Sequence, residues 1–227
     1  MLLKKKVFTD QELNEMGRLT LNLIHEAIDI GDLKKAKGLS KRMYQEFMFM
    51  HDLYRDWLTA LMTYIYENHG ENALYESMKK AVATYLKASV ELHQRSDFRK
   101  RVEMLIAGVR GHGQPLEITE DDEKVIVKGT RCAGELLLES GKYGPPCNFA
   151  MLQKPHTLTF QTTDFPIYCC HAPIQEQLAI DWIGEPVYVS NPADKMAREA
   201  CQCCIYKNRK DVPAKVYERV GRRKSVL

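Results

Sequence analysis

Apolar residues recur at helical intervals through roughly the first 110 positions of the chain. The run Thr9-Asp10-Gln11-Glu12 has the pattern of a capping box, and apolar residues follow it at steps of three and four. Gly31 and Asp32 interrupt this pattern, and Asp32 can cap a second helix that runs from Leu33 to about Phe49. The chain is therefore predicted to begin with two helices.

The strongest apolar stripe follows between Leu53 and Tyr66, and Gly70 is well placed to end that helix. The same spacing predicts further helices over 71–93 and 98–109. Five consecutive helices are typical of a bundle-like region. The segment from Trp57 to Tyr66 could serve as core or as a dimer face, and we favour the core interpretation.

The pattern changes after Gly113 from helical spacing to the period of two that is typical of strands. The strongest signal is a hairpin formed by 115–119 and 124–128. The remaining predicted elements are strands at 158–161, 167–171, 186–189 and 201–206, and a helix at 174–182. The fold class is therefore predicted to be α+β, with a helical half followed by a mainly antiparallel sheet with one or two helices. We divide the chain into a helical region, 1–112, a cysteine-rich α+β region, 113–206, and a basic tail, 207–227.

Composition limits the class of protein. The 227 residues are 44% hydrophobic and 28% charged, which is ordinary for a globular protein. No run of 18 apolar residues is present, so we expect no membrane span. The lysine-rich start lacks the apolar core of a signal peptide, which favours a cytoplasmic location. The tail carries 8 Lys and Arg against 2 Asp and Glu, but no aromatic residues interleave with them as in nucleic-acid-binding surfaces, so nucleic acid is not expected as a partner.

The seven cysteines all lie between Cys132 and Cys204. Their odd number and the predicted reducing compartment argue against a disulfide framework and leave thiols for metal binding or catalysis. Cys132 lies in the segment 130–135, which either presents backbone N–H groups to an anion or simply forms a tight turn before the next apolar run.

Two cysteine clusters, at 169–171 and 201–204, lie in predicted strands, in which alternate side chains share a face. Cys169 and His171 would share one face of their strand, and Cys201 and Cys203 would share one face of theirs, with Cys170 and Cys204 on the opposite sides. A plausible assembly places both pairs on a common face of one sheet. Thiolate and imidazole ligands suit zinc, with iron as the alternative. The predicted metal ligands are Cys169, His171, Cys201 and Cys203, and a site with three of them and an open position would be catalytic.

Two other interpretations of these residues stay open. Cys169 could act as a nucleophile with His171 as its base, or the cysteines could be small buried hydrophobes. Two further acid–base candidates are His112, which lies between two glycines at the helix-to-sheet junction, and Glu176, which follows the Cys-Cys-His run.

Three short features resemble the L-2-amino-thiazoline-4-carboxylic acid hydrolase-like family over roughly residues 60–206. They are the turn His69-Gly70-Glu71-Asn72-Ala73, the cysteine-rich segment from Cys169 to Glu176, and the final Cys-x-Cys-Cys-Ile-Tyr strand from Cys201. The resemblance implies an α+β fold and the opening of a small C–N or C–S heterocycle by water. A similar layout of helices before a sheet occurs in vinyl-reductase-like ligand-binding domains.

The resulting hypothesis is a hydrolase that acts on a small heterocyclic or amide-like substrate through a Cys/His site, with or without zinc. The alternative is a sensory or carrier module that binds a small molecule or metal through the same cysteines, without turnover. A third is a helical interaction protein whose cysteines belong only to the core. A homo-oligomer is compatible with each.

Overall fold

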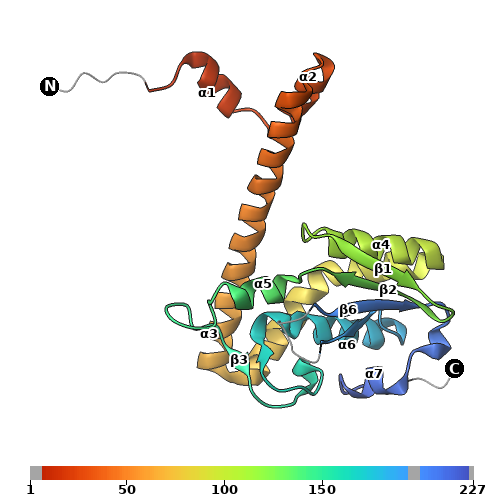
Figure 1. The fold of residues 1–227 in the computed structure, drawn as a ribbon. Coiled ribbons are helices and arrows are strands. Elements are labelled where there is room, and N and C mark those ends of the chain that lie inside the picture. The colour runs from red at the N-terminus through yellow and green to blue at the C-terminus, as the bar shows by residue number, and fades with distance from the viewer. Residues whose placement is uncertain (1–6, 194–199, 225–227) are drawn as a thin grey trace. The chain divides into compact units, whose positions relative to one another are not determined.

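A computed structural model describes residues 7–193 and 200–224 of the chain (Figure 1). It has the predicted α+β fold and divides into two compact units, Met1–Leu53 and Tyr54–Leu227. This division lies well before residue 112, because the helices between 71 and 110 pack within the same unit as the sheet. Residues 1–6, on which the signal-peptide argument rests, lie outside the described part.

The first unit consists of helices. They are α1 (Asp10–Met16), α2 (Thr20–Asp29) and the start of α3 (Leu33–Arg95). The capping box is confirmed, since the backbone N–H of Thr9 donates to the Glu12 carboxylate at 2.7 Å. The sequence predicts one helix before Gly31, but the chain forms two, α1 and α2, with a break after Met16. A small core unites α2 with the start of α3 through Leu23, Ile24, Ala27, Ala36 and Leu39.

Helix α3 continues through the end that was predicted near Phe49, because no Gly or Pro interrupts its backbone there. The predicted stop at Gly70 is confirmed. Gly70 has φ 82° and ψ 177°, a conformation that breaks the helix into two consecutive segments and that favours glycine.

The second unit is built around a four-stranded antiparallel sheet with the order β1-β2-β6-β5. The strands are β1 (Leu116–Glu120), β2 (Lys124–Gly129), β5 (Val189–Asn191) and β6 (Gln202–Tyr206). The predicted hairpin is confirmed as β1 and β2, with Ile118 opposite Val127. A separate pair joins β3 (Met151–Leu152) to β4 (Phe165–Pro166).

Helices cover both faces of this sheet (Figure 1). On one face, α4 (Phe98–Arg110) packs Leu105 against Val125, Val127 and Ile205 of β2 and β6. On the other face lies the larger core, which contains the second segment of α3, α6 (His171–Ile183) and α7 (Ala214–Glu218). The sheet is thus the middle of three layers.

Two predicted strands are wrong. The segment 158–161 contains the 3-10 helix η1 (Thr157–Thr159), and 167–171 contains the 3-10 helix η2 (Ile167–Cys170), which leads directly into α6. Short apolar runs do not distinguish a strand from a buried helical turn, so periodicity alone could not separate the two cases. The apolar run 136–138, which follows the segment 130–135, belongs to α5 (Ala133–Glu139).

The basic tail is a structural part of the second unit. It forms the 3-10 helix η3 (Arg209–Asp211) and α7, and buries Val212, Val216, Tyr217 and Val220 in the larger core. None of the helices in the described residues has both the length and the apolar character needed to cross a membrane.

Candidate functional site: a cysteine and histidine pocket

A pocket of about 160 Å³ lies in the second unit, where the C-terminal end of α4, the start of α5, the turn from η2 into α6 and β6 meet. Six of its lining residues carry thiols or imidazoles, and we call it the Cys/His pocket. These residues are Cys132, Cys169, Cys201, Cys203, His112 and His171.

Cys169 and His171 line this pocket together, as predicted, but from a different local structure. They lie at the end of η2 and the first residue of α6, not on a strand. Cys170 between them is fully buried in the larger core. The turn into α6 therefore separates these two side chains from their intervening neighbour.

The strand argument is confirmed for β6. Cys203 lines the pocket, whereas the next residue, Cys204, is fully buried on the opposite face of the sheet. Cys201, which immediately precedes β6, also lines the pocket. Alternation along the strand thus directs Cys203 to the pocket and Cys204 to the core.

The His171 ring is held in a defined orientation. Its Nδ1 lies 2.7 Å from the carbonyl oxygen of Tyr168, which can only accept, so Nδ1 carries the proton and Nε2 keeps its lone pair. Burial lowers the pKa of His171, although this hydrogen bond acts in the opposite direction. The neutral ring can therefore serve as a base or as a metal ligand through Nε2.

Burial disfavours the thiolate form of the pocket cysteines. Burial raises the pKa of Cys169 well above its ordinary value, and the neighbouring Cys201 and Cys132 raise it further. Burial likewise raises the pKa of Cys203 to about 12. Because the thiolate is the reactive form, these shifts weigh against Cys169 as an unassisted nucleophile.

Sequence reasoning missed Cys132 as a member of the site. This residue is the N-cap of α5, where its Sγ accepts from the backbone N–H of Glu135 at 3.3 Å and its own N–H donates to the Glu135 carboxylate at 3.2 Å. A Glu three residues after an N-cap is the signal that could have identified a helix start here, with Cys in the usual position of Ser or Thr.

Glu176 does not line the Cys/His pocket among the described residues. Its buried carboxylate accepts from the Ser190 backbone N–H at 2.6 Å, and Nη2 of Arg219 lies 2.9 Å from both of its oxygens. Burial raises its pKa to about 7, against the effect of Arg219. Since Ser190 is itself a wall residue, Glu176 supports the pocket from behind, and its predicted acid–base role gains no support from this position.

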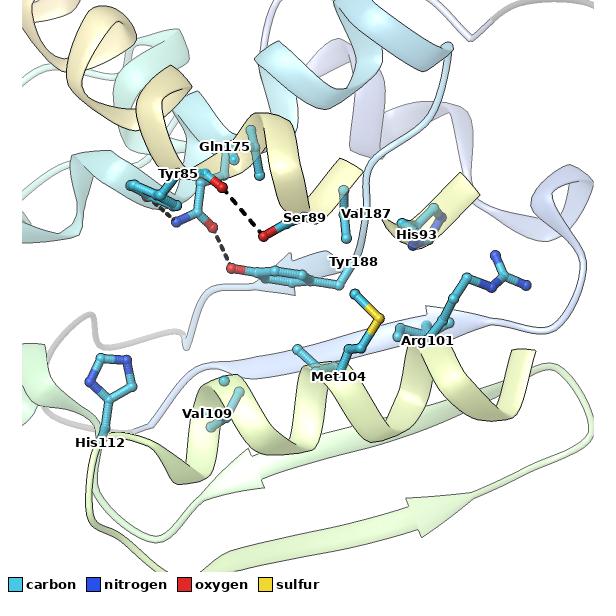
Figure 2. A pocket seen from close by; sticks show the side chains of 14 residues that line it. Tyr85, Ser89, His93, Arg101, Met104, Val109, His112, Gln175, Val187 and Tyr188 are labelled. Atoms are coloured by element: carbon cyan, nitrogen blue, oxygen red, sulfur yellow. Dashed lines mark hydrogen bonds between the residues drawn. The ribbon is translucent and has the colours of Figure 1, made fainter. Parts of the chain in front are cut away.

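His112, an acid–base candidate from the sequence, lies just after α4 and lines the Cys/His pocket. It also lines a neighbouring cavity of about 280 Å³, which is drawn in Figure 2. Val109 and Tyr188 belong to both walls as well. The two spaces are therefore adjacent, and His112 stands at their boundary.

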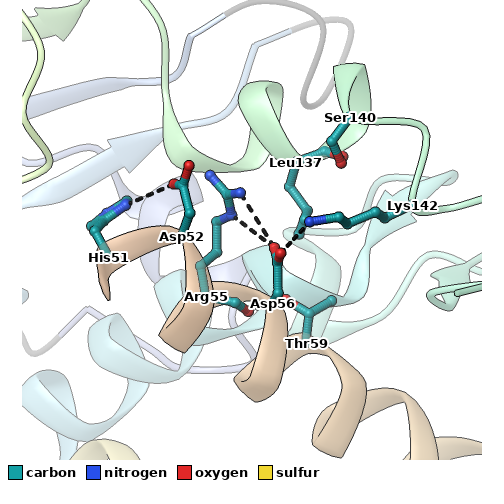
Figure 3. Close-up of polar contacts among 8 residues, drawn as sticks. All are labelled: His51, Asp52, Arg55, Asp56, Thr59, Leu137, Ser140 and Lys142. Atoms are coloured by element: carbon teal, nitrogen blue, oxygen red, sulfur yellow. Dashed lines mark hydrogen bonds and ion pairs between the residues drawn. The ribbon is translucent and has the colours of Figure 1, made fainter. Parts of the chain in front are cut away.

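A polar cluster braces the loop that follows α5 (Figure 3). Arg55, only 6% exposed, places Nη2 3.3 Å from the Asp56 carboxylate, and Lys142 contacts the same carboxylate. These residues do not line the Cys/His pocket in the described part of the chain. We interpret the cluster as a link between α3 and the loop that contains Lys142.

No group of three or more His, Cys, Asp or Glu side chains in residues 7–193 and 200–224 is already arranged to hold a metal ion. Zinc or iron binding therefore stays a prediction. Comparisons with protein families, curated proteins and solved structures found no match. The family resemblance likewise stays a prediction.

Proposed function

We propose that the Cys/His pocket binds a soft transition metal, zinc or alternatively iron, and that the protein is a cytoplasmic hydrolase of a small heterocyclic or amide-like molecule. The candidate ligands are Cys169, Cys201, Cys203 and His171, and Cys132 is a further thiol within the same pocket. Thiolates and imidazoles are the ligands that zinc and iron favour in proteins.

One observation carries this proposal, namely how the cysteines are distributed. Four of the seven line one pocket, whereas Cys170 and Cys204 are fully buried in the core and Cys147 is exposed. Burial of cysteines as small apolar side chains does not by itself explain why four of them line one cavity together with two histidines.

The residues of the pocket divide the chemistry between them. A zinc ion in such a site would supply an activated water molecule. His171, with Nδ1 fixed on the Tyr168 carbonyl, either binds the ion or accepts a proton through Nε2. His112, at the boundary between the pocket and the neighbouring cavity, would exchange a proton with a substrate that enters from that cavity.

A second candidate is a module that binds a metal or small molecule without turnover. It is favoured by the lack of any Asp or Glu among the described residues that line the pocket, which leaves the two histidines to perform all proton transfer. This candidate predicts the same metal content but no hydrolysis.

Elemental mass spectrometry on the untagged full-length protein tests the proposal. We expect about one zinc or iron per chain, with thiols that become reactive after chelation. Cys203→Ser and His171→Gln should lose the metal, whereas Cys147→Ser, which changes an exposed cysteine outside the pocket, should retain it.

Hydrolysis of small cyclic amides and thiazolines by the metal-loaded protein then separates the two candidates. Turnover that His112→Gln reduces while metal content is preserved supports the hydrolase. Metal binding without turnover supports the binding module. A protein that is isolated without metal, takes up none, and has pocket thiols that react only on unfolding would contradict both.

A further inference from the structure

The cavity beside the Cys/His pocket has the features of a binding site for an organic molecule. We call it the Arg101 cavity. It lies between the end of α3, α4 and the segment that leads into β5, and its volume is about 280 Å³ (Figure 2). Because pockets for drug-sized ligands typically span about 300–1,000 Å³, this one suits a smaller molecule.

Much of the cavity wall is apolar. It includes Leu86, Met104, Leu105, Val187 and Ile205. Such a wall favours a ligand with an apolar body, since its burial removes apolar surface from water.

Three polar side chains of the cavity wall form hydrogen bonds with one another. Gln175 Nε2 donates to the Tyr85 hydroxyl at 2.6 Å, and the Tyr188 hydroxyl donates to Gln175 Oε1 (Figure 2). This chain of contacts fixes one wall and leaves few groups there to recognise a charge.

Arg101 differs from these groups. Its Nε is buried without a hydrogen-bond partner, and its guanidinium carbon lies 5.7 Å from the centroid of the Phe98 ring. The nearby Glu185 Oε1 lies at ion-pair distance from Arg209 Nε, 2.9 Å, and from His93 Nε2, 3.4 Å, although neither Oε1 nor His93 Nε2 has a hydrogen-bond partner. A buried N–H without an acceptor is unfavourable, so this guanidinium is poised for an acceptor that enters the cavity.

The charge of Arg101 determines the chemical class of that acceptor. A guanidinium pairs with a carboxylate through two parallel hydrogen bonds, which are stronger than those between neutral groups. Figure 2 shows Arg101 and His93 at one end of the cavity and His112 at the other. An anion held at Arg101 would therefore direct the rest of the molecule toward His112 and the Cys/His pocket.

We infer that the Arg101 cavity binds a small organic carboxylate, with Arg101 as the anchor of the carboxylate and the apolar wall around its body. In naming the substrate class, this inference rests on the proposed function. Binding at Arg101 itself, however, needs no metal in the Cys/His pocket.

Calorimetric titration of the full-length protein with benzoate and with benzamide, its neutral counterpart of similar shape, tests the inference. Benzoate should bind at least tenfold more tightly than benzamide. Arg101→Gln should weaken benzoate binding at least tenfold and leave benzamide binding within twofold. Thermal melting should show that the variant is folded.

Arg99→Gln is the matched control. Arg99 lies on the same helix with its side chain 89% exposed, and it pairs with Glu103 outside the cavity. This variant should change benzoate affinity less than twofold. Equal binding of the two probes, equal losses in the two Arg variants, or no benzoate binding at millimolar concentration would overturn the inference.

Cys203→Ser separates this inference from the proposed function. If the protein holds no metal but binds benzoate through Arg101, the proposed function fails and the inference stands. If the metal binds and benzoate does not, the inference fails and the proposed metal site stands. Benzoate affinity that is unchanged in Cys203→Ser confirms that the two sites bind independently.

Discussion

Cys203 and Cys204 are neighbours in β6, yet they lie in two regions with different physical character. Cys203 faces the Cys/His pocket, whereas Cys204 packs in the larger core on the other face of the sheet. Cys169 and Cys170 differ in a similar way, since Cys169 lines the pocket at the edge of the larger core, whereas Cys170 is fully buried within that core. One residue type thus serves as a chemical group in the first region and as a small hydrophobe in the second, and the two roles lead to different effects of substitution.

The largest effect is expected in the core behind the pocket. Arg219→Met removes the charged partner of the buried Glu176 carboxylate and should lower the free energy of unfolding by about 3–5 kcal/mol at pH 8. Urea unfolding followed by circular dichroism measures this change. The double variant Glu176→Leu, Arg219→Met should recover much of the loss, since no charge is then left buried. A loss below about 1 kcal/mol in the single variant would show that the pair is not a structural element.

The pH dependence of stability should reveal the same pair. Because the pKa of Glu176 is raised to about 7 in the folded protein, its contribution to stability is fully present below its unfolded pKa of about 4.5 and is lost as the pH rises to 7 and above. The free energy of unfolding should therefore fall by about 2–3 kcal/mol from this group between pH 4.5 and pH 8.

Glu176→Gln is the control for this prediction, because it cannot titrate. The free energy of unfolding of the wild-type protein should fall relative to that of this variant as the pH rises from 4.5 to 8. A difference that is constant between pH 4.5 and pH 8 would contradict the raised pKa.

Substitution of adjacent cysteines tests the comparison directly. Cys170→Ser places a hydroxyl in the core and should cost about 1–3 kcal/mol of stability, whereas Cys169→Ser, at the pocket, should cost less than about 1 kcal/mol in the metal-free protein. Chemical unfolding of both variants in the presence of a chelator measures the difference. Equal costs would mean that the two cysteines share one environment.

The smallest energetic effect is expected at Cys147. Cys147→Ser changes an exposed side chain and should alter stability by less than about 0.5 kcal/mol. In the chelated wild-type protein, Cys147 should also react first with a thiol reagent, the pocket cysteines more slowly, and Cys170 and Cys204 only on unfolding. Mass spectrometry of the modified peptides gives this order, and early modification of Cys204 would contradict the division into pocket and core.

Much of the local structure follows from the sequence because its causes are local. The capping box at Thr9, the breaks at Gly31 and Gly70, and the hairpin between β1 and β2 each depend on a few consecutive residues. The opposite orientations of Cys203 and Cys204 also follow from strand geometry alone.

The site required the tertiary structure wherever distant segments had to meet. Cys132 joins Cys169 and Cys203 only because α5 begins beside the turn into α6, and no periodic signal relates these positions. Glu176 looks like a candidate acid in the sequence, but in the structure its buried carboxylate pairs with Arg219, 43 residues later in the chain. The sequence by itself determined the helices, the hairpin and the orientation of side chains within β6, since these depend on backbone geometry between neighbours. Only the tertiary structure decided which side chains share a cavity and which lose their water, because burial depends on contacts between segments far apart in the chain.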